Sequence, residues 1–369
     1  MIPVCEPLVT EREIELVVDC LRTGWISSAG KYLEAFENGW AAYCGMPYGV
    51  AVSNGSVALE VAVALLDLQP GDEVIMPTFT IISCAQAVVA AGGVPVLVDS
   101  DARNWQMDVS QVAARITPRT RALMPVHIYG QPADMDTLWE LASRHNLMII
   151  EDAAEAHGAE YKGRKCGGLG DISTFSFYAN KLITTGEGGM VLTRRPELAE
   201  RARALRNLCF QKERRFLHTE LGHNYRLTNL QAALGVAQLE RFDQIVERKR
   251  AIARAYHERL QDVPGLSLPV EEPWARSVYW VYGVVVDEAT GLDAAQLAQR
   301  LMAMGIETRP FFLGMHEQPV FHRMGLFVGE RYPVAERLAR QGLYLPTGLT
   351  LSEADIDRVC EAVCACLAG

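Results

Sequence analysis

The residue of this sequence best suited to covalent chemistry is a lysine in the segment TFSFYANKLITTGEGGMVL, residues 174–192. Lys181 follows an apolar run that predicts a buried strand, and Ser176 lies near the end of that run. Partial burial lowers the pKa of a lysine amine and makes it nucleophilic, so that it can form Schiff bases. The alternative is a lysine whose ammonium stays at the surface, which is the commoner arrangement.

Two acidic residues end another apolar run, in LMIIEDAAEAHGAEY at residues 147–161. Glu151 and Asp152 would lie at the carboxyl end of a buried strand, where doubly wound sheets bind their ligands. A buried carboxylate needs a partner, and a protonated pyridine nitrogen, a metal ion or an arginine would each serve. An ordinary helix N-cap is a further possibility, since aspartate caps helices well. The segment alone leaves these interpretations open.

Donors suited to a phosphate occur in two other segments. In SNGS, Gly55 lets the backbone approach a ligand, and the free N–H groups around Ser56 at the start of a helix favour an anion. In GHNYRLTNLQAALG, Asn224 and Arg226 add polar donors. The alternative for the first segment is a simple turn and helix cap, and for the second an ordinary polar loop.

Regular alternation of strand and helix patterns positions these residues. Short apolar runs rich in β-branched residues alternate with helical patterns from about residue 46, which predicts an α/β protein whose parallel strands are joined by crossover helices. The expected strands are 48–53, 73–77, 94–99, 121–126 and 147–152, and the expected helices are 57–68, 82–91 and 135–145.

The two ends of the chain have different patterns. Thr10 and Glu13 form a capping box that predicts an N-terminal helix, and we expect the first 45 residues to form an arm or lid. One long helix is expected from Thr228 to about Leu260. A strand at 279–286 and helices at 294–304 and 354–367 then suggest a second α/β unit. We therefore predict a large domain at residues 1–245 and a small C-terminal domain at residues 246–369.

Composition excludes several classes of protein. The 369 residues are 49% hydrophobic, as in ordinary globular proteins, and the net charge of −10 offers no overall positive field for nucleic acid. Nine scattered cysteines without a CxxC pair suggest reduced thiols and no metal site. No export signal and no run of about 18 apolar residues are present, so we expect a cytoplasmic protein that does not enter a membrane.

Together these segments resemble the DegT/DnrJ/EryC1/StrS sugar aminotransferases, pyridoxal 5'-phosphate (PLP) enzymes of the aspartate aminotransferase fold (fold type I). The motifs occur in the expected order over nearly the whole chain: PVCEP, TGWISSAGKYLEAFE, SNGSVAL, PTFT, EDAAEAHGA, FSFYANKLITTGEGG, NYRLTNLQAALG and RPFFLGMHEQP. The resemblance implies a large α/β domain with a mixed, mainly parallel sheet between helices and a smaller C-terminal α/β domain. The implied substrates are L-glutamate and a nucleotide-linked 4-keto-6-deoxy sugar aminated at C4, with GDP-4-keto-6-deoxy-D-mannose expected and a UDP- or dTDP-linked keto sugar as the alternative.

The resemblance also implies catalytic roles. Lys181 matches the lysine that bonds covalently to PLP, and Asp152 matches the carboxylate bonded to the pyridine nitrogen. Glu155 occupies a position near the ring hydroxyl that is often glutamine in relatives, and His157 follows in the same motif.

The implied phosphate site involves a second subunit. Gly55, Ser56 and Ser176 match phosphate-binding positions, while Asn224 matches an asparagine that reaches the cofactor phosphate of the neighbouring subunit. The resemblance thus implies a homodimer with a shared active site, with tetramers possible.

Two positions depart from the family pattern. Many relatives have an aromatic residue over the PLP ring where this chain has Ile81, and many have a proline in the segment that here reads Leu313-Gly314-Met315-His316, which could loosen a substrate loop. Structural roles are the alternative for the substrate candidates, since a tryptophan is commonly core and a buried histidine commonly satisfied. These candidates are Trp25, Ser27, His127, Tyr129, Arg309 and His316.

Two other functions compete with an aminotransferase. A sugar dehydratase of the same family has a histidine in place of the lysine, and Lys181 argues against it. A non-catalytic regulator that binds PLP as a signal would need an added DNA-binding module, for which we expect no room.

Overall fold

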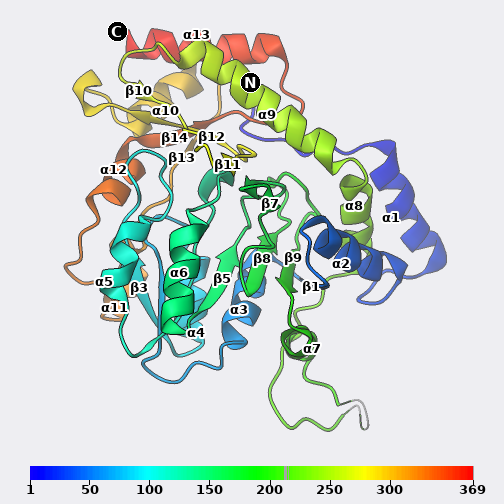
Figure 1. Ribbon diagram of the computed structural model, residues 1–369. Coiled ribbons are helices and arrows are strands. Elements are labelled where there is room, and N and C mark those ends of the chain that lie inside the picture. Colours follow the sequence, from blue (N-terminus) through cyan, green and yellow to red (C-terminus); the bar gives the residue numbers. More distant parts are fainter. Residues whose placement is uncertain (212–213, 215, 369) are drawn as a thin grey trace.

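The central element is a mixed sheet. Within residues 1–211, 214 and 216–368, which the computed structural model describes, the largest sheet has seven strands in the order β1-β9-β8-β5-β4-β2-β3 (Figure 1). Strand β9 is antiparallel to both of its neighbours, whereas β8, β5, β4, β2 and β3 pair in parallel. The expected mixed, mainly parallel sheet is confirmed. Its strands are β1 (Tyr48–Val52), β2 (Glu73–Pro77), β3 (Val94–Val98), β4 (Thr120–Leu123), β5 (Met148–Asp152), β8 (Ile172–Ser176) and β9 (Gly189–Thr193).

Helices cover the sheet because its strands are apolar on both faces. Every residue of β2 and β9 is buried, so neither face of these strands tolerates water. The predicted helix 135–145 matches α6 as observed. The helix predicted at 57–68 begins and ends earlier in the structure, at 55–64, and the helix predicted at 82–91 is one residue shorter at each end. The helices are α3 (Gly55–Ala64), α4 (Ser83–Ala90), α5 (Val112–Arg115), α6 (Met135–His145) and α7 (Pro196–Leu205).

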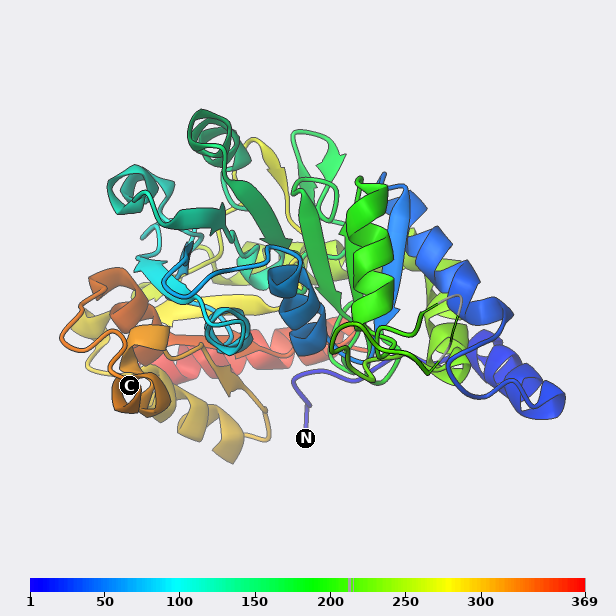
Figure 2. The same cartoon turned by 90° about the horizontal axis from the view of Figure 1, so that it is seen from below.

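The N-terminal helices pack against the rest of the chain, and their expected role as an arm or lid stays a prediction. The capping box of Thr10 and Glu13 opens α1 (Glu11–Thr23) as predicted, and α2 (Lys31–Tyr43) follows. Phe36 and Trp40 of α2 are fully buried against aromatic rings of the sheet region. Figure 2 shows these blue helices at one end of the molecule and the orange elements near residues 315–340 at the other.

The predicted long helix is two helices, α8 (Asn229–Leu239) and α9 (Phe242–Leu260). They meet at Arg241, whose guanidinium donates to the Leu8 carbonyl at 2.8 Å and pairs with the buried Glu13. The periodic pattern continues through the junction, where contacts with the N-terminal segment occur at Gln238, Glu240 and Arg241.

The C-terminal part has a smaller antiparallel sheet in the order β10-β12-β14-β13, lying beside α9 in Figure 1. A separate cluster of buried side chains joins this sheet to α9, α10 and α13, and Ile2 completes it by pairing with Ile306. The domain boundary near residue 245 stays a prediction. The main elements are β10 (Leu266–Ser267), β12 (Tyr282–Val286), α10 (Ala294–Ala303), β13 (Arg309–Pro310), α11 (Pro319–Arg323), α12 (Pro333–Gln341), β14 (Gly342–Leu345) and α13 (Glu353–Leu367).

A short third sheet connects the two parts of the chain. Strand β11 (Ala275–Arg276) pairs with β6 (Glu160–Tyr161), which pairs with β7 (Arg164–Lys165). Among the described residues, no helix is both long and apolar enough to cross a membrane.

Candidate active site

Hydrogen bonds of the loop between β8 and β9 fix the backbone that carries Lys181. The N–H of Lys181 donates to the Tyr178 carbonyl at 2.9 Å, and the Thr184 hydroxyl donates to the Phe177 carbonyl at 2.9 Å. The Thr184 N–H donates to the side-chain oxygen of Gln238 on α8 at 2.9 Å. Threonine and glycine residues in this loop therefore form local hydrogen bonds, which limit the positions that the Lys181 amine can occupy.

The amine of Lys181 lies among buried carboxylates. Its Nζ is 3.9 Å from Oε1 of Glu155. Burial lowers the pKa of Lys181, against the opposing effect of the negative charges of Glu155 and Asp152. Burial likewise raises the pKa of Glu155 to about 7, although Lys181 and the Tyr129 N–H oppose that rise. Burial thus disfavours the charged form of both groups, while their mutual attraction favours it.

Asp152 ends β5 at the carboxyl edge of the sheet, as the sequence predicts, and is 2% exposed. Its Oδ1 accepts the Ala154 N–H at 3.0 Å, and its Oδ2 accepts the Cys84 thiol at 3.2 Å. Burial raises the pKa of Asp152, while these two donors and the charge of Lys181 lower it. A cation placed against this carboxylate would offset the burial.

Its neighbour Glu151 points into a different environment and serves the fold. The Glu151 carboxylate accepts backbone N–H groups of Leu169 and Gly170, each at 2.9 Å, and the Ser173 hydroxyl at 2.7 Å. Alternation of side chains along a strand separates Glu151 from Asp152.

His157 lies under the site in an aromatic environment. Its Nε2 donates to the Ser176 carbonyl at 2.8 Å, and its ring packs against Trp40 and Phe175. Burial, together with the positive charge of Lys181, lowers the pKa of His157 to about 3. The imidazole is neutral and anchors the end of β8, which carries Ser176.

The predicted phosphate residues of one chain come together at the start of α3. A Cβ atom at Gly55 would lie 2.6 Å from Cβ of Ser176, so only glycine fits beside the end of β8. The hydroxyls of Ser56 and Ser83 are 2.7 Å apart, which joins the first turns of α3 and α4. Ile81 precedes α4 and is 41% exposed, an apolar surface available to cover a ligand.

His127 is held inside the protein rather than at a ligand surface. Its Nδ1 accepts the Ala133 N–H at 3.0 Å, so the ring proton is on Nε2, which donates to Glu151 at 3.0 Å. The ring is fully buried, and both nitrogens have partners. This arrangement does not favour the predicted substrate contact.

Tyr129 contributes its backbone to the site. It adopts a left-handed φ of 57°, uncommon outside glycine, and its N–H donates to Glu155 at 2.8 Å. The buried phenol packs among the rings of Phe311 and Phe312, and its hydroxyl has no hydrogen-bond partner within the described chain.

The C-terminal substrate candidates have structural contacts. His316 is buried, with Nδ1 2.8 Å from the Thr78 hydroxyl and Nε2 3.4 Å from Glu336. The Met315 N–H also donates to the Thr78 carbonyl at 2.9 Å, which connects this segment to the end of β2. Arg309 is exposed and pairs with Glu307.

Trp25, Ser27 and Asn224 lie outside this cluster. Trp25 is 59% exposed and is not core, and its carbonyl accepts the Asn229 side chain at 2.7 Å. The Ser27 carbonyl accepts the Asn229 N–H at 2.6 Å. Asn224 is exposed. Their surfaces are available to a second molecule.

Sequence reasoning missed two residues that contact the site and one that joins two elements outside it. Cys84 touches Asp152, Trp280 touches Lys181 at its ring face, and Asn229 ties α8 to the Trp25 segment. Asn229 lies in the segment GHNYRLTNLQAALG, and Cys84 follows PTFT closely. No sequence pattern around Trp280 indicates a residue of the site.

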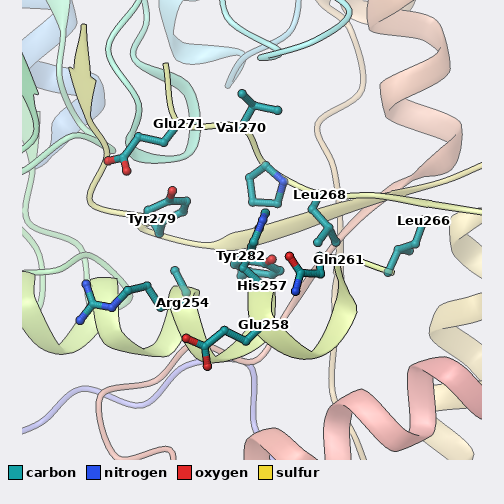
Figure 3. A pocket seen from close by; sticks show the side chains of 12 residues that line it. Arg254, His257, Glu258, Gln261, Leu266, Leu268, Val270, Glu271, Tyr279 and Tyr282 are labelled. Atoms are coloured by element: carbon teal, nitrogen blue, oxygen red, sulfur yellow. The ribbon is translucent and has the colours of Figure 1, made fainter. Parts of the chain in front are cut away.

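A large cavity of about 690 Å³ lies elsewhere, between α9 and the segment around β10, and Figure 3 shows the side chains that line it. Its lining contains neither Lys181 nor Asp152. The cluster around Lys181 is the better candidate because it joins a nucleophile to perturbed carboxylates.

The residues fit PLP on their own chemistry. Lys181 is a buried amine whose lowered pKa suits a covalent bond to an aldehyde, and Asp152 is a buried carboxylate whose ionised form is favoured by the positive charge of Lys181. The glycine-lined start of α3 beside Ser176 supplies N–H and hydroxyl groups for a phosphate.

Several known proteins are similar to this chain in sequence or in fold. A model of the DegT/DnrJ/EryC1/StrS aminotransferase family matches residues 7–364. The GDP-perosamine synthase of Caulobacter vibrioides is 44% identical, covering 98% of this chain and 97% of its own. A dTDP-3-amino-3,4,6-trideoxy-alpha-D-glucose transaminase of Streptomyces venezuelae is 42% identical, covering 90% and 86%. The crystal structure of the aminotransferase TlmJ from Streptoalloteichus hindustanus, 33% identical, has a TM-score of 0.93 and covers 100% and 99%.

Proposed function

The chain belongs to the DegT/DnrJ/EryC1/StrS aminotransferase family, and from this premise we propose that it moves the amino group of L-glutamate to C4 of GDP-4-keto-6-deoxy-D-mannose, giving GDP-perosamine. Enzymes of this family use PLP, and the fold is that of the PLP aminotransferases. The observation that carries the proposal is the buried amine of Lys181, 3.9 Å from Glu155 and under the electrostatic influence of Asp152.

The choice of a GDP sugar is supported by likeness along the whole chain. The GDP-perosamine synthase of C. vibrioides matches 97% of its own length, whereas the dTDP-sugar transaminase of S. venezuelae matches 86%. A UDP- or dTDP-linked keto sugar is the second candidate, because the latter relative is nearly as similar in identity.

Lys181 would move the protons of both half-reactions. Its Nζ takes the α-proton of glutamate and, after 2-oxoglutarate has left and the keto sugar has entered, returns a proton at C4 of the sugar. PLP, when bound, accepts the electrons of the broken C–H bond. Glu155, whose pKa is raised to about 7, lies 3.9 Å from the same Nζ and would stabilise its positive charge when ionised.

The other residues would bind and orient the cofactor. Asp152 keeps the pyridine nitrogen protonated by its negative charge, and Ser176, Ser56 and the N–H groups after Gly55 hold the phosphate. Glu155 would also lie near the ring hydroxyl. Ile81 would cover one ring face by aliphatic packing, supported by its exposure beside α4.

A homodimer would complete the site, with Asn224 of one subunit reaching the phosphate of the other. The proposal is supported by the exposure of Asn224 and by two exposed apolar residues, Trp25 and Leu221, which are 59% and 92% exposed. Trp25, Ser27 and Arg309 remain the candidates for contact with the sugar nucleotide. A cytoplasmic location is supported by cysteines that are all free within the described residues.

The first experiment tests the covalent lysine. After incubation with PLP, the wild-type protein should absorb at about 410 to 430 nm, and Lys181→Ala should lose this band. Lys249→Met is a matched control, because Lys249 is another buried lysine and its loss should leave the band in place. A wild-type protein without the band would contradict the proposal.

The second experiment tests the substrate. The enzyme is incubated with glutamate and with GDP-, UDP- and dTDP-linked keto sugars, and release of 2-oxoglutarate is measured. The highest kcat/KM should occur with the GDP sugar, whereas turnover confined to UDP or dTDP sugars would replace the GDP assignment and leave the aminotransferase assignment intact.

A further inference from the structure

Trp280 lies directly against the amine of Lys181. The Nζ atom is 3.5 Å from the centroid of the indole ring. Trp280 precedes β12 in the C-terminal part of the chain and is 5% exposed, so water is largely excluded from the contact. A cation that approaches the face of an indole ring is attracted by the ring's quadrupole, and the attraction grows when both groups are desolvated.

The same side chain also fixes the backbone that carries the lysine. Its Nε1–H donates to the Asn180 carbonyl at 2.8 Å. That carbonyl belongs to the peptide bond that joins Asn180 to Lys181. One side chain therefore contacts the lysine at both ends, the backbone through its edge and the amine through its face.

We propose that Trp280 is a positioning residue that holds the free amine of Lys181 as an ammonium over its ring and locks the Asn180–Lys181 peptide bond in place. The inference rests on the proposed function for the role of Lys181 and deepens it. A neutral ring stabilises the cation without binding a proton of its own. When Nζ loses its proton the electrostatic attraction weakens, and the amine is free to leave the ring.

The protonation of Nζ depends on the charged groups around it as well as on the Trp280 ring. Glu155 and Asp152, at and just after the end of β5, favour the ammonium form of Lys181. The charge of that ammonium in turn helps to lower the pKa of buried His157. Lys249 of α9 lines the same small cavity as Lys181 and carries like charge. Burial disfavours the ammonium. The face of the Trp280 ring therefore stabilises the ammonium together with the two carboxylates, whereas burial destabilises it.

The test measures the ionisation of Lys181 in the full-length protein with PLP removed. A trace of acetic anhydride labels the amines across a pH titration, and mass spectrometry of the Lys181 peptide gives its acid dissociation constant. In Trp280→Leu this constant should rise about fivefold, because the ammonium loses the ring. In Trp280→Phe, which keeps an aromatic face, it should rise by less than about twofold.

Two controls accompany the titration. Trp274→Leu makes the same chemical change at a tryptophan that packs on Tyr161, and it should leave Lys181 unchanged. Exposed Lys31 serves as the internal reference in every sample. An unchanged Lys181 constant in folded Trp280→Leu overturns the proposal.

A second measurement does not depend on how Trp280→Leu folds. The six tryptophans are replaced by 5-fluorotryptophan, and the fluorine resonance of Trp280 is assigned with Trp280→Phe. In the wild type this resonance should titrate at the same pH as Lys181, and in Lys181→Met that step should vanish. A resonance that ignores the titration of Lys181 overturns the proposal, and the cofactor spectrum described above tests the proposed function separately.

Discussion

Burial shifts the pKa of each ionisable group in this site more than any single partner does. Burial raises the pKa of Asp152 and Glu155 and lowers the pKa of Lys181 and His157. Each of these shifts disfavours the charged form, as expected when water is removed. A bound cofactor with a cationic nitrogen would restore the charge of Asp152, which is the electrostatic reason for its position.

Asp152→Asn should slow the conversion of glutamate to 2-oxoglutarate by about a hundredfold or more, because a neutral amide cannot stabilise a protonated pyridine nitrogen. Single-turnover kinetics with PLP-loaded enzyme measure the step. Cys84→Ser keeps a donor against the same carboxylate and should stay within about threefold of wild type. A near-normal rate in Asp152→Asn would remove Asp152 from the mechanism.

His157 should make folding stability depend on pH in acid. Its pKa is lowered from 6.5 to about 3 in the folded protein, so the unfolded chain binds a proton that the folded chain does not. The stability it contributes is present above pH 6.5 and is lost as the pH falls toward 3, by about 1.4 kcal/mol per pH unit.

Urea unfolding at several pH values measures this effect. In His157→Gln, the slope of unfolding free energy against pH should decrease by about one proton between about pH 6 and pH 4. His145→Gln alters an exposed histidine and should keep the wild-type slope. Equal slopes for wild type and His157→Gln would contradict the shifted pKa.

At the scale of elements, Glu151 joins β5 to the turn that precedes β8. Three backbone N–H groups, at Gly167, Leu169 and Gly170, and the Ser173 hydroxyl converge on its carboxylate. Hydrogen bonds to the carboxylate from such donors, and from His127, lower its pKa against the effect of burial. This cluster holds β5 and β8 in register and therefore holds Asp152 relative to Ser176.

Glu151→Gln should destabilise the fold by about 3 kcal/mol or more, because the amide brings donors toward backbone donors inside the protein. Chemical denaturation measures the loss. Glu140→Gln, on the exposed face of α6, should change stability by less than about 0.5 kcal/mol. A wild-type denaturation midpoint for Glu151→Gln would show that the cluster does not support the sheet edge.

At the scale of the whole molecule, the proposed dimer predicts complementation between two inactive variants. Lys181→Ala lacks the amine and Asn224→Ala lacks the donor offered to the other subunit. A mixed dimer contains one site with both residues intact, so random mixing should restore about one quarter of wild-type activity. Steady-state assays after subunit exchange measure it.

The outcome separates two arrangements of the site. Activity that does not rise on mixing, in a sample whose sedimentation shows dimers, would mean that each site draws Asn224 from its own chain or not at all. A monomer under assay conditions would exclude the shared site altogether.

The sequence by itself determined most strands of the large sheet and the main residues at its edge. Apolar runs with β-branched residues predict the strands, and Asp152 and Ser176 come at the ends of two such runs, which became parallel neighbours β5 and β8. Capping chemistry determined where α1 begins. These features are local, because strand and helix patterns depend on residues a few positions apart.

Only the tertiary structure decided which side chains surround the reactive amine. Trp280 is far from Lys181 in the sequence and reaches it because the segment before β12 joins the buried core of the large sheet and its helices, which no local pattern encodes. For the same reason His127 turned inward to Glu151, and the helical pattern from Thr228 to Leu260 divided at Arg241. Periodicity predicts which element forms, whereas contacts between distant elements determine what each side chain touches.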